Sequence, residues 1–188
     1  KDFVEDKDPR AWDNLVTRLL ASPHYGERWG RHWLDVVRYA DSNGADENKS
    51  YPLAYHYRNY VIDAFNQDRP FDEFVREQLA GDLLPGTGEV ALTNRRLTAT
   101  TYLAMGIKID AEKDGEKKRS DIIDEQIDTI SRSLLGVTVA CARCHNHKFD
   151  PIPTTDYYAM AGVLRSTDLA DRKLNSGEKQ ELQKELKH

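Results

Sequence analysis

Residues 120–145 read SDIIDEQIDTISRSLLGVTVACARCH, and this stretch decides how the whole chain is interpreted. Its first half places large apolar side chains at the three- and four-residue spacing of one helix face: Ile123, Ile127, Ile130 and Leu134. Ser120 can cap such a helix, and Gly136 can end it. The stretch therefore predicts an amphipathic helix that is followed, within a few residues, by a pair of cysteines.

The same helical spacing recurs on both sides of this stretch. Asp8-Pro9 and Ser22-Pro23 are helix-start signals, because a capping side chain precedes a proline at the first helical position. We predict helices over residues 9–20, 23–40, 53–65, 70–80, 95–105, 120–136 and 154–164, and a solvated loop over the charged run 111–119. No alternation of apolar and polar residues persists, so the fold class is all-α, an irregular bundle of about six to eight helices.

Composition limits the kind of protein. The 188 residues include 27 Lys+Arg and 32 Asp+Glu, a net charge of −5 that disfavours a nucleic-acid partner. The chain is 39% hydrophobic with a mean hydropathy of −0.73, which predicts a thin apolar core. No run approaches the roughly 20 apolar residues of a membrane span. Because the chain opens at Lys1 without a Met, we expect a processed or excised piece.

The domain boundary is predicted near Thr167. Residues 1–167 form the helical domain in this interpretation. Residues 168–188 are almost all charged or polar, with Leu174, Leu182 and Leu186 as the sizeable apolar side chains. We expect this segment to be a charged linker or an exposed C-terminal helix.

The cysteines lie in the pattern Cys141-Ala-Arg-Cys144-His145. On a helical turn, two thiols three residues apart project to the same side, and a histidine four residues after the first cysteine joins them. This spacing is typical of haem c attachment, in which two thioethers hold the porphyrin edge and the imidazole binds the iron. We therefore predict one covalent haem c around which the helices pack, with His145 as its proximal ligand.

Two other chemistries compete for the same residues. His147 would add a fourth ligand for zinc within seven residues, although zinc usually draws on two separated pairs and no second Cys/His pair is present. A redox dithiol is the other alternative, but thioredoxin-like dithiols have a βαβ context that this chain lacks.

The sixth iron ligand decides what the haem would do. A second strong ligand favours electron transfer, whereas an open position permits ligand binding or peroxide chemistry. His32 is the preferred distal ligand here, because it lies mid-helix between Trp29 and Trp33. The remaining candidates are His56, His24, Met105 and Met160. Trp33 is expected to line the haem pocket, and Arg143 to pair with a propionate.

An oxygen-rich loop is a possible second cation site. It contains Asp41, Asn43, Asp46, Glu47 and Asn48. Such a loop can hold Ca²⁺, but the glycine and the glutamate do not follow EF-hand spacing. A solvated turn is therefore the preferred interpretation, and a Ca²⁺ site is the alternative.

Three blocks of the chain resemble a known family. They are SPHYGERWGRHWLDVVRYADSNG (22–44), YRNYVIDAFNQDRPFDEFVREQLAGDLLP (57–85) and CARCHNHKFDPIPTTDYYAMAGVL (141–164). Together they resemble the planctomycete cytochrome-type domain, over about residues 12–166. The resemblance implies a secreted, mostly helical module with covalent haem, found in large exported proteins and often beside a small cytochrome c domain.

These observations predict a c-type cytochrome domain that transfers single electrons as a module of an exported redox protein. The alternatives are a haem enzyme or small-ligand binder with an open distal site, and a zinc-stapled interaction domain without haem. A redox partner protein or an adjoining cytochrome domain is the expected partner. The expected location is periplasmic or extracellular, because thioether attachment of haem takes place outside the cytoplasm.

Overall fold

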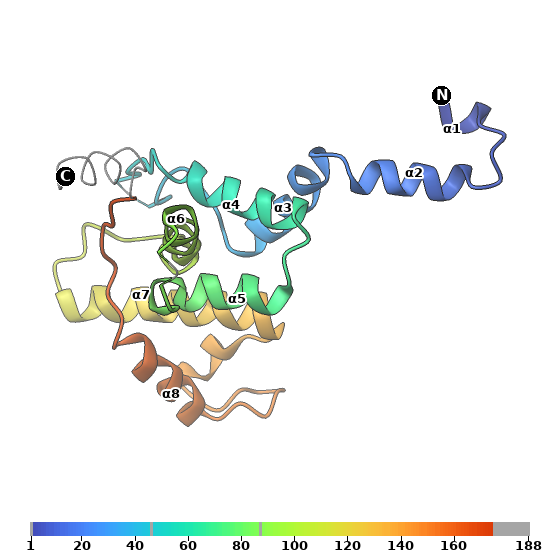
Figure 1. Ribbon diagram of the computed structural model, residues 1–188. Coiled ribbons are helices and arrows are strands. Elements are labelled where there is room, and N and C mark those ends of the chain that lie inside the picture. Colours follow the sequence, from blue (N-terminus) through green and yellow to red (C-terminus); the bar gives the residue numbers. More distant parts are fainter. Residues whose placement is uncertain (1, 46, 87, 175–188) are drawn as a thin grey trace, which may run out of the picture.

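The computed structural model describes residues 2–45, 47–86 and 88–174, and it is helical throughout this part of the chain (Figure 1). The α-helices are α1 (Asp2–Glu5), α2 (Ala11–Leu20), α3 (His24–Val36), α4 (Tyr55–Asn66), α5 (Phe71–Ala80), α6 (Val90–Ala99), α7 (Gly115–Ile130) and α8 (Thr154–Leu164). Shorter helical turns are η1 (Gly81–Leu83), η2 (Thr100–Leu103), the π-helical η3 (Ser131–Leu135) and η4 (Val139–Arg143). Within the described residues the only β-pairing is an isolated bridge between Ser42 and Ser50. The all-α prediction is confirmed.

The closest helix pair is α3 against α4, and two glycines explain the approach. A Cβ on Gly26 would lie 2.3 Å from the backbone oxygen of Ile62, so only glycine fits there. Gly26 N–H also donates to Asn66 Oδ1 at 2.7 Å. Gly30 follows one turn later, where a Cβ would lie 3.3 Å from Val61 Cγ1. Both glycines are buried, so they bring the two helix backbones into contact.

The helices α3 and α4, together with α5, α6 and η2, enclose the larger of two apolar clusters, called here the aromatic core. Its buried members are Val37, Ala54, Tyr57, Tyr60, Val61, Ala64, Phe74, Ala99, Tyr102 and Met105. Buried polar side chains in this core are hydrogen-bonded to one another. Tyr57 Oη donates to Gln78 Oε1 at 2.5 Å, and Trp33 Nε1–H donates to the same oxygen at 3.0 Å. The aromatic core therefore buries polar atoms without leaving these groups unpaired.

The smaller cluster, called here the motif core, lies between α7, η4 and α8. Its buried members are Ile123, Ile127, Val139, Ala142, Tyr157 and Leu164. Figure 1 shows α8 and the loop after η4 at the foot of the molecule, below α7. The predicted apolar face of the 120–136 helix thus contributes its two most buried residues to this cluster.

The start of α7 differs from the prediction. The helix begins at Gly115, not at Ser120, so the second half of the expected loop 111–119 is helical. Asp114 is the cap, because its Oδ1 accepts from the backbone N–H groups of Glu116 and Lys117. Ion pairs from Lys117 to Glu112 and from Lys118 to Asp110 hold the preceding turn. The charged residues for which we predicted a solvated loop therefore form the cap and the ion pairs at the start of α7.

The predicted helix over 95–105 is also displaced. It begins at Val90, and its α-helical part ends at Ala99, with η2 continuing to Leu103. Gly106 then turns the chain with a φ of 97°, where a side chain would collide with the Glu125 carboxylate. The predicted end at Gly106 is close, whereas the helix begins five residues before the predicted start at residue 95.

The two ends of the described chain are the least covered. No residue of α2 is buried, and Figure 1 shows α1 and α2 extending away from the other helices. Residues 168–174 have no regular secondary structure. The rest of the segment 168–188, predicted to be a linker or an exposed helix, lies outside the described residues. None of the helices described is long and apolar enough to cross a membrane.

Candidate cysteine–histidine site

Cys141 and Cys144 lie on one tight turn at the edge of the motif core. Cys141 is inside η4 and Cys144 follows its last residue, and both thiols are free and exposed. Ala142, between them, is fully buried in the motif core. Cys141 N–H donates to the carbonyl of Thr138 at 3.0 Å, which closes the turn. The fold therefore anchors this turn through Ala142 and presents both cysteines to solvent.

His145 is exposed next to the second cysteine. Its Nδ1 lies 2.8 Å from the backbone oxygen of Asn146. A carbonyl oxygen can only accept, so Nδ1 carries the hydrogen and the Nε2 lone pair is left available in the neutral ring. Metal-binding histidines usually show this arrangement, in which one ring nitrogen is fixed by a carbonyl.

Arg143, predicted to bind a cofactor, has a partner inside the protein. Its Nη1 lies 3.1 Å from Asp124 Oδ2 on α7. Tyr157 Oη donates to the other oxygen of the same carboxylate at 2.8 Å. The pKa of Tyr157 is raised mainly because the side chain is buried, and secondly because of this hydrogen bond to Asp124. The arginine therefore ties the cysteine turn to α7 and α8, and its role toward a cofactor stays a prediction.

A second arginine, which the sequence did not single out, lies near the first cysteine. Arg132 of η3 donates through Nε to Asp128 Oδ1 at 2.7 Å. This hydrogen bond raises the pKa of Arg132, and the Cys141 thiol adds a smaller contribution in the same direction. Arg132 is thus within electrostatic reach of Cys141. Its position nine residues before the cysteine gave no signal, because the path of the chain from η3, which contains Arg132, to Cys141 is not visible in local spacing.

His147 is held by hydrogen bonds through both ring nitrogens, which bears on the zinc alternative. Nδ1 accepts from the backbone N–H of Asp150 at 2.8 Å, and Nε2 lies 3.0 Å from Thr138 Oγ1. Neither nitrogen is left for a metal. Over the parts of the chain that the structure describes, no three His, Cys, Asp or Glu side chains group closely enough to hold a metal ion. The arrangement thus disfavours a tetrahedral site built on the two cysteines with His145 and His147.

The predicted distal ligands are spread over the molecule. His32 is exposed on α3 and lies against Trp29 with tilted rings whose centroids are 5.5 Å apart, and Trp33 packs against Phe74 in the aromatic core. The other candidates are placed as follows: His24 pairs with Glu27, His56 stacks on Tyr55, Met105 is buried in the aromatic core, and Met160 packs on the motif core. Among the described residues, no hydrogen bond, ion pair or ring contact joins His32 or Trp33 to Cys141, Cys144 or His145. Their roles therefore stay predictions.

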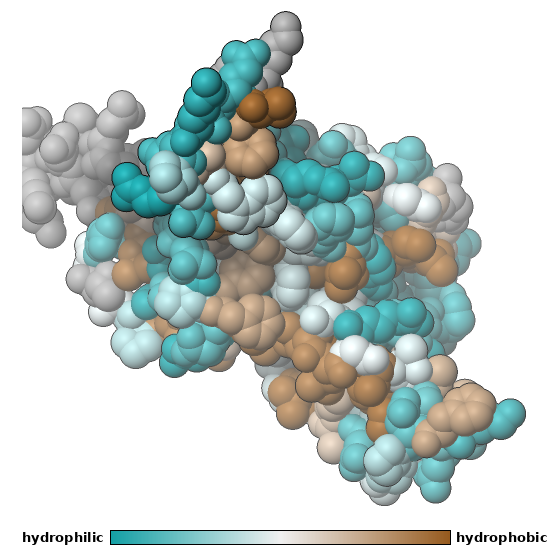
Figure 2. Space-filling view, turned by 90° about the vertical axis from the view of Figure 1, so that its right-hand side faces the viewer, coloured by the Kyte–Doolittle hydropathy of each residue, from teal (hydrophilic) through white to brown (hydrophobic). Residues whose placement is uncertain are grey.

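Large apolar side chains are exposed on the elements around the cysteine turn. Leu135 ends η3 and is 61% exposed, Phe149 follows the motif and is 83% exposed, and Tyr158 of α8 is 58% exposed. Tyr158 Oη reaches the backbone oxygen of Arg143 at 3.3 Å, so it borders the turn directly. Figure 2 shows apolar residues at the surface of the lower part of the molecule. The motif therefore lies on a surface with uncovered apolar area.

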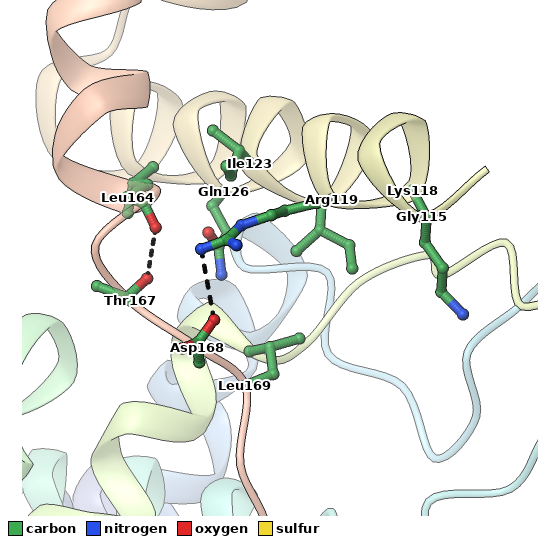
Figure 3. Close-up of a pocket in the computed structure, with 10 residues that line it drawn as sticks. Gly115, Lys118, Arg119, Ile123, Gln126, Leu164, Thr167, Asp168 and Leu169 are labelled. Carbon is green, nitrogen blue, oxygen red and sulfur yellow. Dashed lines mark hydrogen bonds and ion pairs between the residues drawn. The ribbon is translucent and has the colours of Figure 1, made fainter.

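Two cavities of the described residues lie away from the cysteine turn. The larger, of about 240 Å³, is formed between α7 and the chain after α8 (Figure 3). Arg119 points from α7 toward Asp168 across it, with 3.5 Å between Nη2 and Oδ1. The second, of about 160 Å³, lies beside Lys108 and Glu125. Neither is lined by residues 141–145, and both are smaller than the ~300–1,000 Å³ of ordinary ligand pockets.

Polar contacts with residues outside it hold the oxygen-rich loop 41–48. Asn43 is 1% exposed and donates through Nδ2 to the backbone oxygen of Lys108 at 3.2 Å. Asp41 accepts from Tyr39 Oη at 2.7 Å, and Glu47 pairs with Lys49 at 3.0 Å. Asp46 lies outside the described residues. The Ser42–Ser50 bridge closes this loop, and the Ca²⁺ site stays a prediction.

Fold and site together define an all-helical protein with a free Cys-X-X-Cys-His turn at its surface. The chain belongs to the PSCyt2 family, described as a protein of unknown function (DUF1549), whose model matches residues 1–169. No curated protein and no solved structure matches it. The family match ends two residues after the predicted domain boundary at 167.

Proposed function

We propose that the chain is a monohaem c-type cytochrome domain that transfers single electrons. In this proposal Cys141 and Cys144 hold the haem through two thioethers, and His145 Nε2 is the proximal iron ligand. The haem supplies an iron centre that changes its charge by one electron. The protein orients that centre and sets its environment.

The observation that carries the proposal is the presentation of the three residues. Two free thiols face solvent from one turn whose intervening Ala142 is buried. The adjacent imidazole has Nδ1 engaged with the Asn146 carbonyl, so Nε2 is the nitrogen left to bind a metal. The donor set therefore fits a haem c, and it does not need a third protein ligand in the same cluster.

The apolar surface around the turn supports the same proposal. Leu135, Phe149 and Tyr158 are exposed on the segments before and after the cysteines, and Tyr158 Oη lies 3.3 Å from the Arg143 backbone oxygen. A porphyrin is a large apolar plate, and covering this surface with it would remove apolar area from water, worth about 25 cal/mol per Å². The proposal also explains how a chain with a mean hydropathy of −0.73 completes its core.

Location and partners follow from the proposed cofactor. Thioether attachment of haem takes place outside the cytoplasm, so we place the domain in the periplasm or outside the cell. A haem on an exposed turn can exchange electrons with a redox partner protein or an adjoining cytochrome domain, because it needs no deep channel.

A second candidate function is favoured by the positions of the distal-ligand candidates. His24 and His56 are engaged with neighbours on their own helices, and Met105 is buried in the aromatic core. An iron bound only by His145 would have an open face, which suits the binding of small ligands or turnover of peroxide.

Co-expression with a haem c maturation system tests the proposal. We expect a Soret band, sharp reduced bands and an intact mass increased by one covalent haem. Cys141→Ala/Cys144→Ala should abolish the mass increase, whereas Thr17→Ala, an exposed substitution on α2, should leave it unchanged. A colourless protein at its polypeptide mass would overturn the proposal, and its zinc content would then be measured. A low-spin ferric spectrum supports electron transfer, and a high-spin one the open site.

A further inference from the structure

His147 forms a bridge between the chain before the cysteine turn and the chain after it. Its side chain is only 7% exposed, although its neighbours on both sides are exposed. Nδ1 accepts from the backbone N–H of Asp150 at 2.8 Å and of Phe149 at 3.3 Å. Nε2 lies 3.0 Å from Thr138 Oγ1. Thr138 precedes η4, whereas Phe149 and Asp150 follow His145, so one ring spans the whole motif.

These contacts define the form of the ring. Backbone N–H groups can only donate, so Nδ1 must carry a lone pair and not a hydrogen. The ring hydrogen is therefore on Nε2 and is donated to the Thr138 hydroxyl. The Asp150 carboxylate is farther from Nδ1, at 3.4 Å, than the amide of the same residue. His147 is thus fixed as one tautomer in one orientation.

The backbone around His147 is held as well. Its own N–H donates to the carbonyl of Ile152 at 2.8 Å, and Asn146 Oδ1 accepts from the N–H of Thr154 at 3.0 Å. The loop that carries the Asn146 carbonyl, on which His145 Nδ1 rests, is therefore closed at both ends. A loop fixed in this way holds His145 in one position relative to the two cysteines.

We propose that His147 is a positioning residue, whose ring fixes the segment 138–150 so that Cys141, Cys144 and His145 are presented together to the haem. This inference rests on the proposed function for its final step. In this role His147 neither binds the iron nor contacts the haem. Its ring works through its hydrogen bonds to Thr138, Phe149 and Asp150.

The test compares two substitutions of the same residue. His147→Gln keeps a side-chain oxygen that can accept and an amide that can donate, whereas His147→Leu keeps bulk and removes both. Lys148→Ala, at the next and exposed position, is the matched control. All three are made in the full chain and measured both without haem and after haem c maturation.

Without haem, amide hydrogen exchange at Phe149 and Asp150 reports the bridge itself. Loss of the acceptor in His147→Leu should speed exchange there by about tenfold, with less change in the Gln variant and none in the control. Unchanged exchange in His147→Leu would overturn the bridge.

With haem, the ferric spectrum and the reduction potential report His145 ligation. We expect His147→Leu to give a mixture of iron ligation states and a shifted potential, and His147→Gln to restore the spectrum of the unmodified protein. If His147→Leu only lowers the melting temperature and leaves the spectrum and potential of the folded protein unchanged, positioning is overturned. If the unmodified protein takes up no haem, the proposed function fails and this step falls with it, whereas the exchange result on the bridge still stands.

Discussion

The aromatic core and the motif core differ in where they place their polar groups. In the aromatic core, Glu77 and Gln78 are fully buried and paired with arginine, tyrosine and tryptophan side chains. In the motif core, the buried cluster has six members, and the reactive side chains Cys141, Cys144 and His145 face solvent around it. The aromatic core buries its polar groups, whereas the polar and thiol groups of the motif core are exposed to solvent.

This difference indicates a division of labour within one fold. Buried and satisfied polar networks rigidify a core, because breaking one partner leaves the other desolvated and unpaired. Exposed donors on a small cluster contribute little to stability, but they remain accessible for chemistry. We therefore expect substitutions in the aromatic core to change the free energy of unfolding most.

The largest expected effect is at Glu77. Its carboxylate accepts from Arg69 Nη1 at 3.2 Å and from Arg95 Nε at 3.0 Å, and the Arg69 side chain is only 4% exposed. Glu77→Gln keeps the size but leaves Arg69 buried without its counter-charge, so the free energy of unfolding should fall by about 3–5 kcal/mol. Urea unfolding followed by far-UV circular dichroism measures this change.

Glu73 supplies the control for that experiment. It pairs with the same Arg95 at 2.8 Å, but its side chain is 41% exposed. Glu73→Gln should cost less than about 1 kcal/mol, because water screens the pair. Equal losses for the two variants would contradict the view that burial of the charge is what distinguishes this core.

The next effect concerns the α3–α4 contact. Gly26→Ala would place a Cβ 2.3 Å from the Ile62 backbone oxygen, and that atom cannot move without shifting α4. We expect a loss of about 1–3 kcal/mol from this overpacking. At Gly30 the nearest atom is Val61 Cγ1 at 3.3 Å, a side-chain methyl that can adjust. Thermal unfolding should therefore rank Gly30→Ala well above Gly26→Ala in stability, and the reverse order would refute the backbone clash.

The sequence predicted what depends on local patterns. The structure contains the predicted apolar face of Ile123 and Ile127, the helix end at Gly136 and the helix from 154 to 164. These features depend on side-chain spacing and on caps, which involve residues only a few positions apart. The shared turn of Cys141 and Cys144 was predicted for the same reason. Asp114 was missed as a cap, since the charged run around it was interpreted by composition and not by its acceptor at the helix start.

Partners distant in the sequence could not be predicted. Arg143 pairs with Asp124, 19 positions earlier, and Trp33 donates to Gln78, 45 positions later. Such pairs depend on how helices pack, which no local spacing records. The hydrogen bonds of His147 to backbone amides could not be predicted for a different reason, because they depend on the loop conformation between Phe149 and Ile152.

A smaller effect is expected where the motif core has its own polar contact. Tyr157→Phe removes the hydrogen bond to Asp124 Oδ1 and should cost about 1 kcal/mol at neutral pH. Burial and the bond to Asp124 raise the pKa of Tyr157, so its contribution is full below pH 10 and is lost as the pH rises above that value. The difference between the two proteins should therefore shrink in alkaline urea titrations. Tyr158→Phe, which loses only a 3.3 Å bond at an exposed position, is the control and should change less.

The smallest effect has the opposite sign. Gly162 lies inside α8, and a Cβ built there meets no atom within 4 Å. Alanine restricts the unfolded chain and favours the helix, so Gly162→Ala should raise the free energy of unfolding by about 0.5–1 kcal/mol. Because α8 packs on the turn that carries the cysteines, the gain should also slow amide exchange in α8 and η4. Equal slowing of exchange in the aromatic core would show that the two cores unfold together, and not as separate units.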